Sequence, residues 1–158
     1  MAVKAEFKIS GIVELQRKLL ERKEALKQTL DMKLQQLAED AVSHAKDNKG
    51  YKDRTANLKN SISFALFYDG ELITQQVGDI PKPKEAPKEH KGVATNLSQF
   101  CSEEGVVRPK GYSLIIVAGM EYGAHVEHKG YNVLHLTKYF LRDEMRKILE
   151  ETIDEIKR

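Results

Sequence analysis

The sequence contains one cysteine, no tryptophan and no long apolar run. A single cysteine excludes an intrachain disulfide bond, and no window approaches the ~20 apolar residues of a membrane-spanning helix. The first eleven residues lack the continuous apolar stretch of a secretory signal peptide. We therefore expect a soluble protein of a reducing compartment that makes no membrane contact.

A strong excess of charge of one sign is also absent. The 26 lysines and arginines nearly balance the 24 acidic residues, which leaves a net charge of +2. This balance gives little electrostatic reason for non-specific binding to nucleic acid. A local excess of basic residues lies between Lys46 and Lys59, and it keeps a nucleic-acid-binding module open as an alternative. A solvated helix end is the simpler interpretation, so DNA contact is not expected as the main role.

The 158 residues suit a single domain, 1–158. Hydrophobic residues make up 41% of the chain and charged residues 32%. These proportions indicate a small core with much solvated helix surface, or a subunit that completes its core in an oligomer.

Two segments have the period of an amphipathic helix. The first, Ile12 to about Asp47, contains neither proline nor glycine, and Ser10 is its expected N-cap. Its apolar stripe is interrupted only by Arg22. At about 54 Å, such a helix exceeds a domain whose radius of gyration is near ~15 Å. We expect it either to bend into two or to pack its outer part on a neighbouring subunit. The second helix is predicted at Lys138 to Lys157, after an ambiguous stretch from Asn132 to Thr137.

Several segments have the alternation of a strand. An Asp69-Gly70 turn between two of them predicts a hairpin. The most apolar segment, Y-S-L-I-I-V-A, predicts a strand buried on both faces. The predicted strands are Val3–Ile9, Ser61–Tyr68, Glu71–Val77, Tyr112–Ala118 and a short one at Ala124–His128.

Residues 78–111 differ in character, because three of the four prolines lie there. These prolines cannot donate ladder hydrogen bonds. We predict a mobile, Pro/Lys-rich insertion arm with one short helix around Ala94 to Glu103. The whole pattern predicts an α+β fold, with a long N-terminal helix and a C-terminal helix packed on a small, mostly antiparallel β-sheet.

The densest cluster of chemically reactive side chains is E-Y-G-A-H-V-E-H-K-G, at 121–130. On a strand, His125 and Glu127 would share one face and His128 would lie on the other. Two ligands are too few for a metal site, so a third would have to come from a histidine elsewhere in the chain. A metal-dependent hydrolase that uses His125, Glu127 and His128 stays open as an alternative.

Other signatures of an enzyme are missing from the sequence. It has no H-E-x-x-H, C-x-x-C or G-x-S-x-G motif and no phosphate-binding glycine loop. Cys101 lies beside Glu103 and Glu104, whose charges would raise its pKa and weaken it as a nucleophile. We therefore assign no catalytic residue, no metal ligand and no cofactor, and expect a non-enzymatic protein.

Four short motifs occur in a recognisable order: S-G before the long helix, D-R-T-A-N-L-K-N-S-I at 53–62, E-Y-G-A-H-V-E-H-K-G at 121–130 and Y-F-L-R-D-E-M at 139–145. In this combination the sequence resembles the putative tail-component, or head–tail completion, family of long-tailed phages, the gene-product-ten-like proteins of the lambdoid capsid type. Ala56 stands where that family usually has glycine, His128 replaces a common aromatic residue, and 78–111 resembles an insertion. The matching positions, which we take as candidate interaction residues, are Thr55, Asn57, Leu58, Tyr122, Val126, Glu127, Phe140, Leu141 and Arg142.

The resemblance implies a virion assembly protein that works in a ring. Its partners would be further copies of itself and other neck or tail proteins of the virion, and a tail terminator or head-closure subunit is the alternative within this class. It would be found in the host bacterial cytoplasm during assembly and then in the neck or tail of the virion. The overhanging helix and a sheet edge near Val126 are the surfaces expected to meet neighbours.

Overall fold

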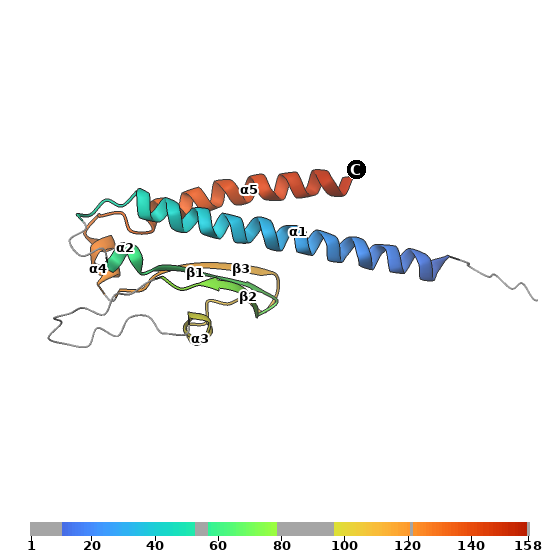
Figure 1. The fold of residues 1–158 in the computed structure, drawn as a ribbon, viewed down its shortest axis with the longest axis horizontal. Coiled ribbons are helices and arrows are strands. Elements are labelled where there is room, and N and C mark those ends of the chain that lie inside the picture. The colour runs from blue at the N-terminus through green and yellow to red at the C-terminus, as the bar shows by residue number, and fades with distance from the viewer. Residues whose placement is uncertain (1–10, 53–56, 79–96, 121, 158) are drawn as a thin grey trace, which may run out of the picture.

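The computed structural model describes residues 11–52, 57–78, 97–120 and 122–157. It has the predicted α+β fold, in which a long N-terminal helix and a C-terminal helix pack on a three-stranded antiparallel sheet (Figure 1). The strand predicted at Val3–Ile9 lies outside the described residues. The elements are α1 (Ile12–Asp47), α2 (Asn57–Asn60), β1 (Ile62–Tyr68), β2 (Glu71–Gln76), α3 (Leu97–Glu103), β3 (Tyr112–Ala118), α4 (Gly123–His128) and α5 (His135–Lys157).

Helix α1 is one unbroken helix of 36 residues, so it does not bend into two. Its N-cap position is Gly11, at φ 98°, and not Ser10 as predicted. The carbonyl oxygen of Gly11 accepts the first helical hydrogen bond, from the N–H of Leu15 at 2.9 Å. Glycine reaches this left-handed conformation without the steric clash that a Cβ would cause.

Helix α5 lies antiparallel to α1 along the part of α1 that is nearer its C-terminal end (Figure 1). Near the start of α5, the rings of Phe140 and His44 stack with centroids 4.5 Å apart. At its other end, Nη2 of Arg22 donates to the carbonyl oxygen of Ile156 at 3.2 Å. Since α1 is about 54 Å long and α5 about 35 Å, the N-terminal turns of α1 project past the end of α5.

The sheet has the order β2-β1-β3, with β1 in the centre. The turn predicted at Asp69-Gly70 is confirmed, and both residues have positive φ, 50° and 85°, as a type I′ hairpin turn requires. The predicted alternation in β1 is also confirmed. Ile62, Phe64 and Leu66 face the helices, whereas Ala65 and Phe67 face the other side.

Both faces of the sheet are covered near β1. On one face, the C-terminal half of α1 packs its buried alanines and leucines on the sheet. On the other face, Leu97 and Cys101 of α3 pack against Ala65 and Phe67. Residues 97–103 are therefore part of the core rather than of a solvated arm, and residues 79–96 of the predicted arm lie outside the described residues. Burial raises the pKa of the Cys101 thiol.

Strand β3 differs from its prediction, because it is an edge strand and most of its side chains are only half-buried. The strand that is buried on both faces is β1. The serines just before and within β1 are satisfied locally, since Oγ of Ser61 donates to the carbonyl oxygen of Leu58 at 2.9 Å and Oγ of Ser63 to that of Ser61 at 3.0 Å.

Candidate functional site

The segment 124–128, predicted as a short strand, is the helix α4. A carboxylate oxygen of Glu127 accepts hydrogen bonds from the backbone N–H groups of Val133 and Leu134, at 3.0 and 2.8 Å. These two N–H groups lie just before α5, where the positive end of the helix dipole favours a negative charge. Glu127 therefore fixes the chain between α4 and α5.

Asn132 joins the same loop to the end of α1. Its Oδ1 accepts from the N–H of Leu136 at 2.8 Å, and its Nδ2 donates to the carbonyl oxygen of Asn48 at 2.6 Å. The N–H of Gly50 donates to the carbonyl oxygen of Asn132 at 3.0 Å. A Cβ at Gly50 would lie 2.7 Å from the backbone nitrogen of Asn132, so this close approach requires glycine. The Asn132 contacts also explain why α5 begins at His135, earlier than the predicted Lys138.

Four of the nine candidate interaction residues come together at this end of the molecule. Leu58 is buried in a cluster with Met120 and Val133, and Val126 packs on that cluster from α4. Tyr122, at the start of α4, is about one-third exposed. With Glu127, these residues hold the α2–α4 end together, so most of them serve the fold rather than an open surface. Asn57 begins α2 and accepts the N–H of Ser61, and Thr55 lies outside the described residues.

The other three candidates lie in the early turns of α5. Phe140 is turned toward His44 of α1. Leu141 and Arg142 border an open hollow between α5 and β3. Arg142 is exposed, and its guanidinium lies 5.3 Å from the ring centroid of Tyr139. Leu141 and Arg142 are therefore available to a partner, whereas Phe140 is an internal contact.

The helical form of 123–128 changes the geometry assumed for a metal site. His125 and His128 are three positions apart on α4 and exposed, while the carboxylate of Glu127 is engaged with the α5 loop. Within residues 11–52, 57–78, 97–120 and 122–157, no three His, Cys, Asp or Glu side chains are grouped so that they could hold a metal ion.

The basic segment from Lys46 to Lys59 follows the end of α1. His44 and Lys46 lie in the last turn of the helix, where positive charge complements the helix dipole. Farther along, Nζ of Lys49 lies 5.9 Å from the ring centroid of Tyr51, and Arg54 lies outside the described residues. These contacts are those of a solvated helix end.

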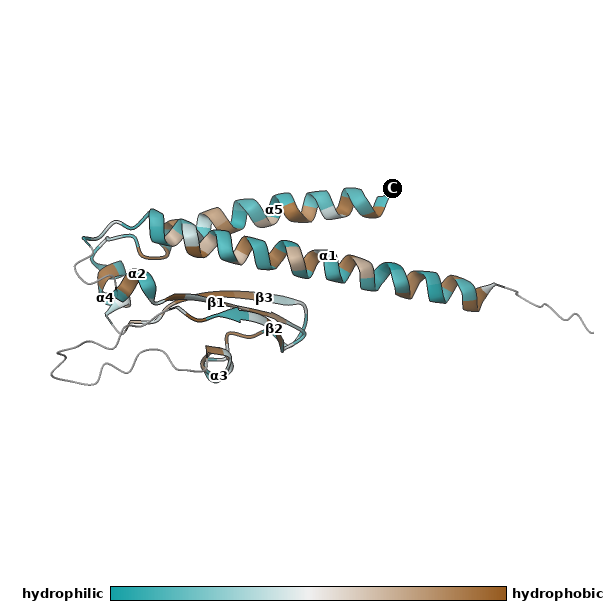
Figure 2. Cartoon of the chain, viewed as in Figure 1, coloured by the Kyte–Doolittle hydropathy of each residue, from teal (hydrophilic) through white to brown (hydrophobic). Residues whose placement is uncertain are grey.

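The apolar stripe of α1 has two very different environments. Toward the C-terminal end, Leu34 and Leu37 are each only 3% exposed. On the same stripe near the N-terminal end, Leu15 and Leu19 are each 58% exposed. Figure 2 shows apolar residues along the part of α1 that projects beyond α5. The exposed apolar residues of this projecting part are Ile12, Val13, Leu15, Leu19 and Leu20.

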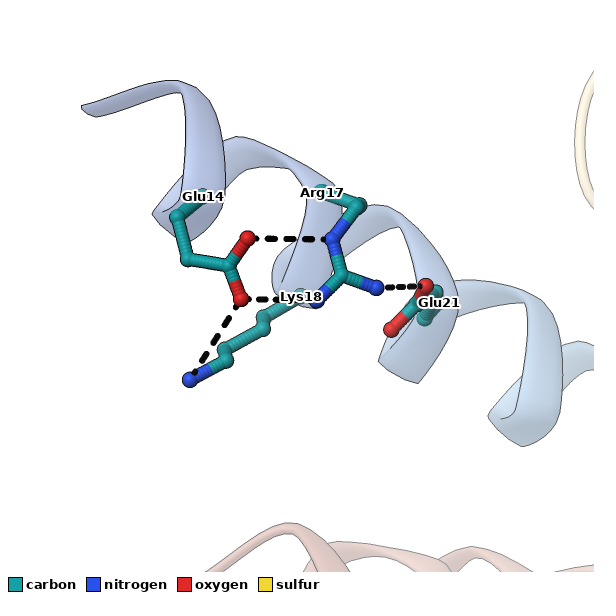
Figure 3. Close-up of polar contacts among 4 residues, drawn as sticks. All are labelled: Glu14, Arg17, Lys18 and Glu21. Carbon is teal, nitrogen blue, oxygen red and sulfur yellow. Dashed lines mark hydrogen bonds and ion pairs between the residues drawn. The ribbon is translucent and has the colours of Figure 1, made fainter. Parts of the chain in front are cut away.

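The polar face of the projecting part carries a network of ion pairs (Figure 3). The guanidinium of Arg17 contacts both carboxylate oxygens of Glu14, at 2.6 and 3.1 Å, and also Oε1 of Glu21, at 2.5 Å. The hydrogen bond from Arg17 lowers the pKa of Glu14. Pairs at these spacings support an isolated helix, so the projecting part can remain helical although its stripe is uncovered.

An apolar groove runs along the outer edge of β3, beneath α5. It consists of two adjoining hollows of about 390 and 480 Å³, which share Ile116, Leu134 and Lys138. We call it the β3 groove; its lining includes Leu114, Ile116, Leu134, Leu141 and Met145. Together with the stripe of α1, it is an apolar surface open to a partner.

A second cluster joins α1 to the beginning of β3. The hydroxyl of Tyr112 donates to Oδ1 of Asp31 at 2.6 Å, and Nζ of Lys27 contacts Oδ2 of the same carboxylate at 2.7 Å. Burial and the Asp31 carboxylate raise the pKa of Tyr112 well above its usual range. The hydrogen bond to Asp31 likewise raises the pKa of Lys27.

Two functional features were missed at the level of sequence. Arg22 appeared only to interrupt the apolar stripe, but it contacts the carbonyl end of α5. Asn132 was placed in an ambiguous stretch, although an asparagine ahead of an apolar-periodic segment is a helix-start signal. No feature of the amino-acid sequence alone indicates that β3 lies at the edge of the sheet.

No helix in the described part of the chain is long and apolar enough to cross a membrane. Comparison of the chain with protein-family models, with curated proteins and with solved structures found no match.

Proposed function

We propose that this chain is a non-enzymatic assembly subunit of a phage or prophage virion, in the neck or tail-completion region, and that it acts through protein–protein contacts in a ring. The resemblance of its four motifs to the tail-component family suggests the class. The surface of the described residues supports the mode of action.

The observation that carries the proposal is the uncovered stripe on the projecting part of α1. Monomeric soluble proteins rarely expose a large contiguous apolar patch, and such patches mark interaction sites. The ion pairs on the opposite face support the helical form of this part. A helix that is apolar on one side and not covered by its own core is suited to packing against a neighbouring subunit.

The geometry also suits a ring. The projecting stripe lies at one end of the molecule, and the β3 groove lies beside the core. A contact between two different surfaces is heterologous, and it closes into a ring when the rotation per subunit divides a full turn.

The test is the assembly state of the purified chain and its binding to neck and tail proteins encoded by the same phage or prophage. Light scattering and electron microscopy should show ring-shaped oligomers, alone or with such a partner. Replacing Leu15 and Leu19 with lysine should abolish the assembly while circular dichroism stays unchanged. Gln28→Lys, on the opposite face of the same helix, is the matched control and should assemble normally.

A strict monomer that also fails to bind every neck and tail protein tested would overturn the proposal. Genes for capsid, portal and tail-tube proteins beside its own gene are expected.

A further inference from the structure

The two edges of the sheet differ in how well they are protected against pairing with another chain. Strand β2 is rich in polar residues, and its pairing with β1 is interrupted by a register shift at Leu66/Phe67. Polar side chains and bulges are the usual means of blunting an edge. Strand β3 is less protected, because Y-S-L-I-I-V-A contains no charge and no proline, its one serine is buried, and it pairs with β1 without a shift.

The register shows which backbone groups of β3 point away from the sheet. The N–H of Gly119 donates to the carbonyl oxygen of Ser61, and the N–H of Asp69 to that of Gly111. Residues that exchange bonds with β1 alternate in an antiparallel ladder, so Ser113, Ile115 and Val117 bond inward. The N–H and C=O groups of Leu114 and Ile116 therefore point outward, and their side chains line the β3 groove.

An added strand would bond to the N–H and C=O groups that point outward from β3. The chain has a segment whose sequence suits such a strand. Residues 3–9 read V-K-A-E-F-K-I, in which apolar and charged residues alternate strictly. This segment has the same seven-residue length as β3. On the edge of β3, its four apolar side chains would lie on the groove side and its charged side chains on the other.

The segment is too short to pair along β3 of its own molecule. Leu114 packs against the cluster that contains Leu34 and Leu37 of α1. From Gly11 to Leu34, a straight α-helix spans about 35 Å. The chain from Gly11 back to Val3 spans at most about 29 Å when fully extended. Ile116 and Ala118 pack still farther along α1, against the cluster that contains Ala38 and Ala45.

We propose that residues 3–9 of one copy add as a fourth strand to the outer edge of β3 in a second copy, with Val3, Ala5, Phe7 and Ile9 in the β3 groove. The projecting part of α1, to which the segment is joined in sequence, extends past the end of α5 (Figure 1). This inference deepens the proposed function, and it rests on that function for the expectation that copies assemble.

The experiment uses two full-length variants that each damage one side of the contact. Phe7→Asp places a charge on the apolar side of the donor segment. Ile116→Pro removes an N–H that points outward, so the ladder to β1 keeps its bonds. Each variant alone should be a monomer by light scattering under conditions in which the wild-type chain is oligomeric. Mixed in equal amounts, they should form a one-to-one heterodimer and nothing larger, because only one donor and one edge remain intact.

Each variant has a matched control. Lys8→Asp introduces the same charge on the other side of the donor segment. Gln75→Pro removes an outward N–H on β2, since Phe64 and Leu66 bond toward β2 and pair with Gln76 and Thr74. Both controls should assemble as the wild type does. If Ile116→Pro fails to fold by circular dichroism, Ile116→Lys, which leaves the backbone intact, replaces it.

Hydrogen exchange provides an independent measurement. In the wild-type oligomer, the amides of Leu114 and Ile116 should exchange more slowly than in Phe7→Asp. A wild-type chain that stays monomeric overturns the inference, as do folded variants that assemble normally or a mixture that forms no heterodimer. Loss of binding to neck and tail proteins, with the heterodimer intact, would instead overturn the proposed function and leave this contact standing.

Discussion

The two halves of α1 share one stripe but are stabilised in different ways. In the C-terminal half, the stripe is buried against the sheet and α5. In the N-terminal half the stripe is exposed, and the helix is supported by the ion pairs of Arg17 on its other face (Figure 3). Arg22 marks the boundary, since it contacts the last turn of α5. A helix can thus be specified over its whole length by sequence while its first turns are left uncovered by its own domain.

The largest difference between the halves should appear on truncation of leucines in the same stripe. Leu37→Ala removes a side chain that is 3% exposed, and should lower the free energy of unfolding by about 2–5 kcal/mol. Leu15→Ala should change it by no more than about 0.5 kcal/mol. Urea unfolding of dilute protein, followed by circular dichroism, measures both. Equal effects of the two substitutions would mean that the halves do not differ as described.

The next largest effect on stability is expected in the loop between α4 and α5, which positions α5 against the buried half of α1. Glu127→Gln weakens two charge-assisted hydrogen bonds to the N–H groups of Val133 and Leu134, and should cost about 2 kcal/mol. Glu150→Gln, on an exposed position of α5, should have almost no effect. In Glu127→Gln, hydrogen exchange should become faster in α5 and leave the rate in the projecting part of α1 unchanged. An unchanged unfolding midpoint would show that Glu127 does not hold this loop.

Near the boundary, Tyr112 should make stability depend on pH. Its pKa is raised in the folded state, so its contribution is present below the unfolded pKa of about 10 and is lost as pH rises above it. Tyr112→Phe should lower stability by about 1 kcal/mol at neutral pH and make the alkaline loss smaller. Urea titrations at neutral and alkaline pH test this, with Tyr131→Phe, an exposed tyrosine, as the control. If wild type and Tyr112→Phe lose the same amount of stability at alkaline pH, groups other than Tyr112 cause that loss.

The smallest effect is expected at Arg17. Arg17→Ala removes exposed ion pairs to Glu14 and Glu21, which salt screens and which contribute little to global stability. The unfolding midpoint should not move, but helicity of the monomer should fall slightly at low salt. Raising the salt concentration should reduce the difference in far-ultraviolet circular dichroism between variant and wild type. A persistent difference at high salt would point to a packing role for the Arg17 side chain.

The fold class followed well from the sequence because long, regular patterns carried it. The stripe of α1 covers many turns, and the alternation in β1 places Phe64 and Phe67 on opposite faces as predicted. Short segments were less informative. Residues 124–128 are too few to separate strand from helix by period. The helix that forms there places Glu127 against the loop before α5.

The position of β3 could not be predicted from its composition. A run such as L-I-I-V predicts burial, but it does not say whether the covering chain is the same molecule or another one. The candidate residues taken from the resemblance show a related limit. Leu58 and Val126 pack inside the α2–α4 end, whereas Arg142 borders the groove. A resemblance between short motifs points to positions, and only packing separates those that hold the fold from those open to a partner.

The burial of Cys101 has a practical consequence for spectroscopy. The side chain is 0% exposed and the pKa of its thiol is raised, so thiol reagents should modify it slowly in the folded protein. A cysteine introduced on the projecting part of α1 would then accept a fluorophore or spin label selectively, with the native sulfhydryl left in place. Distances between labelled copies could be followed as subunits come together.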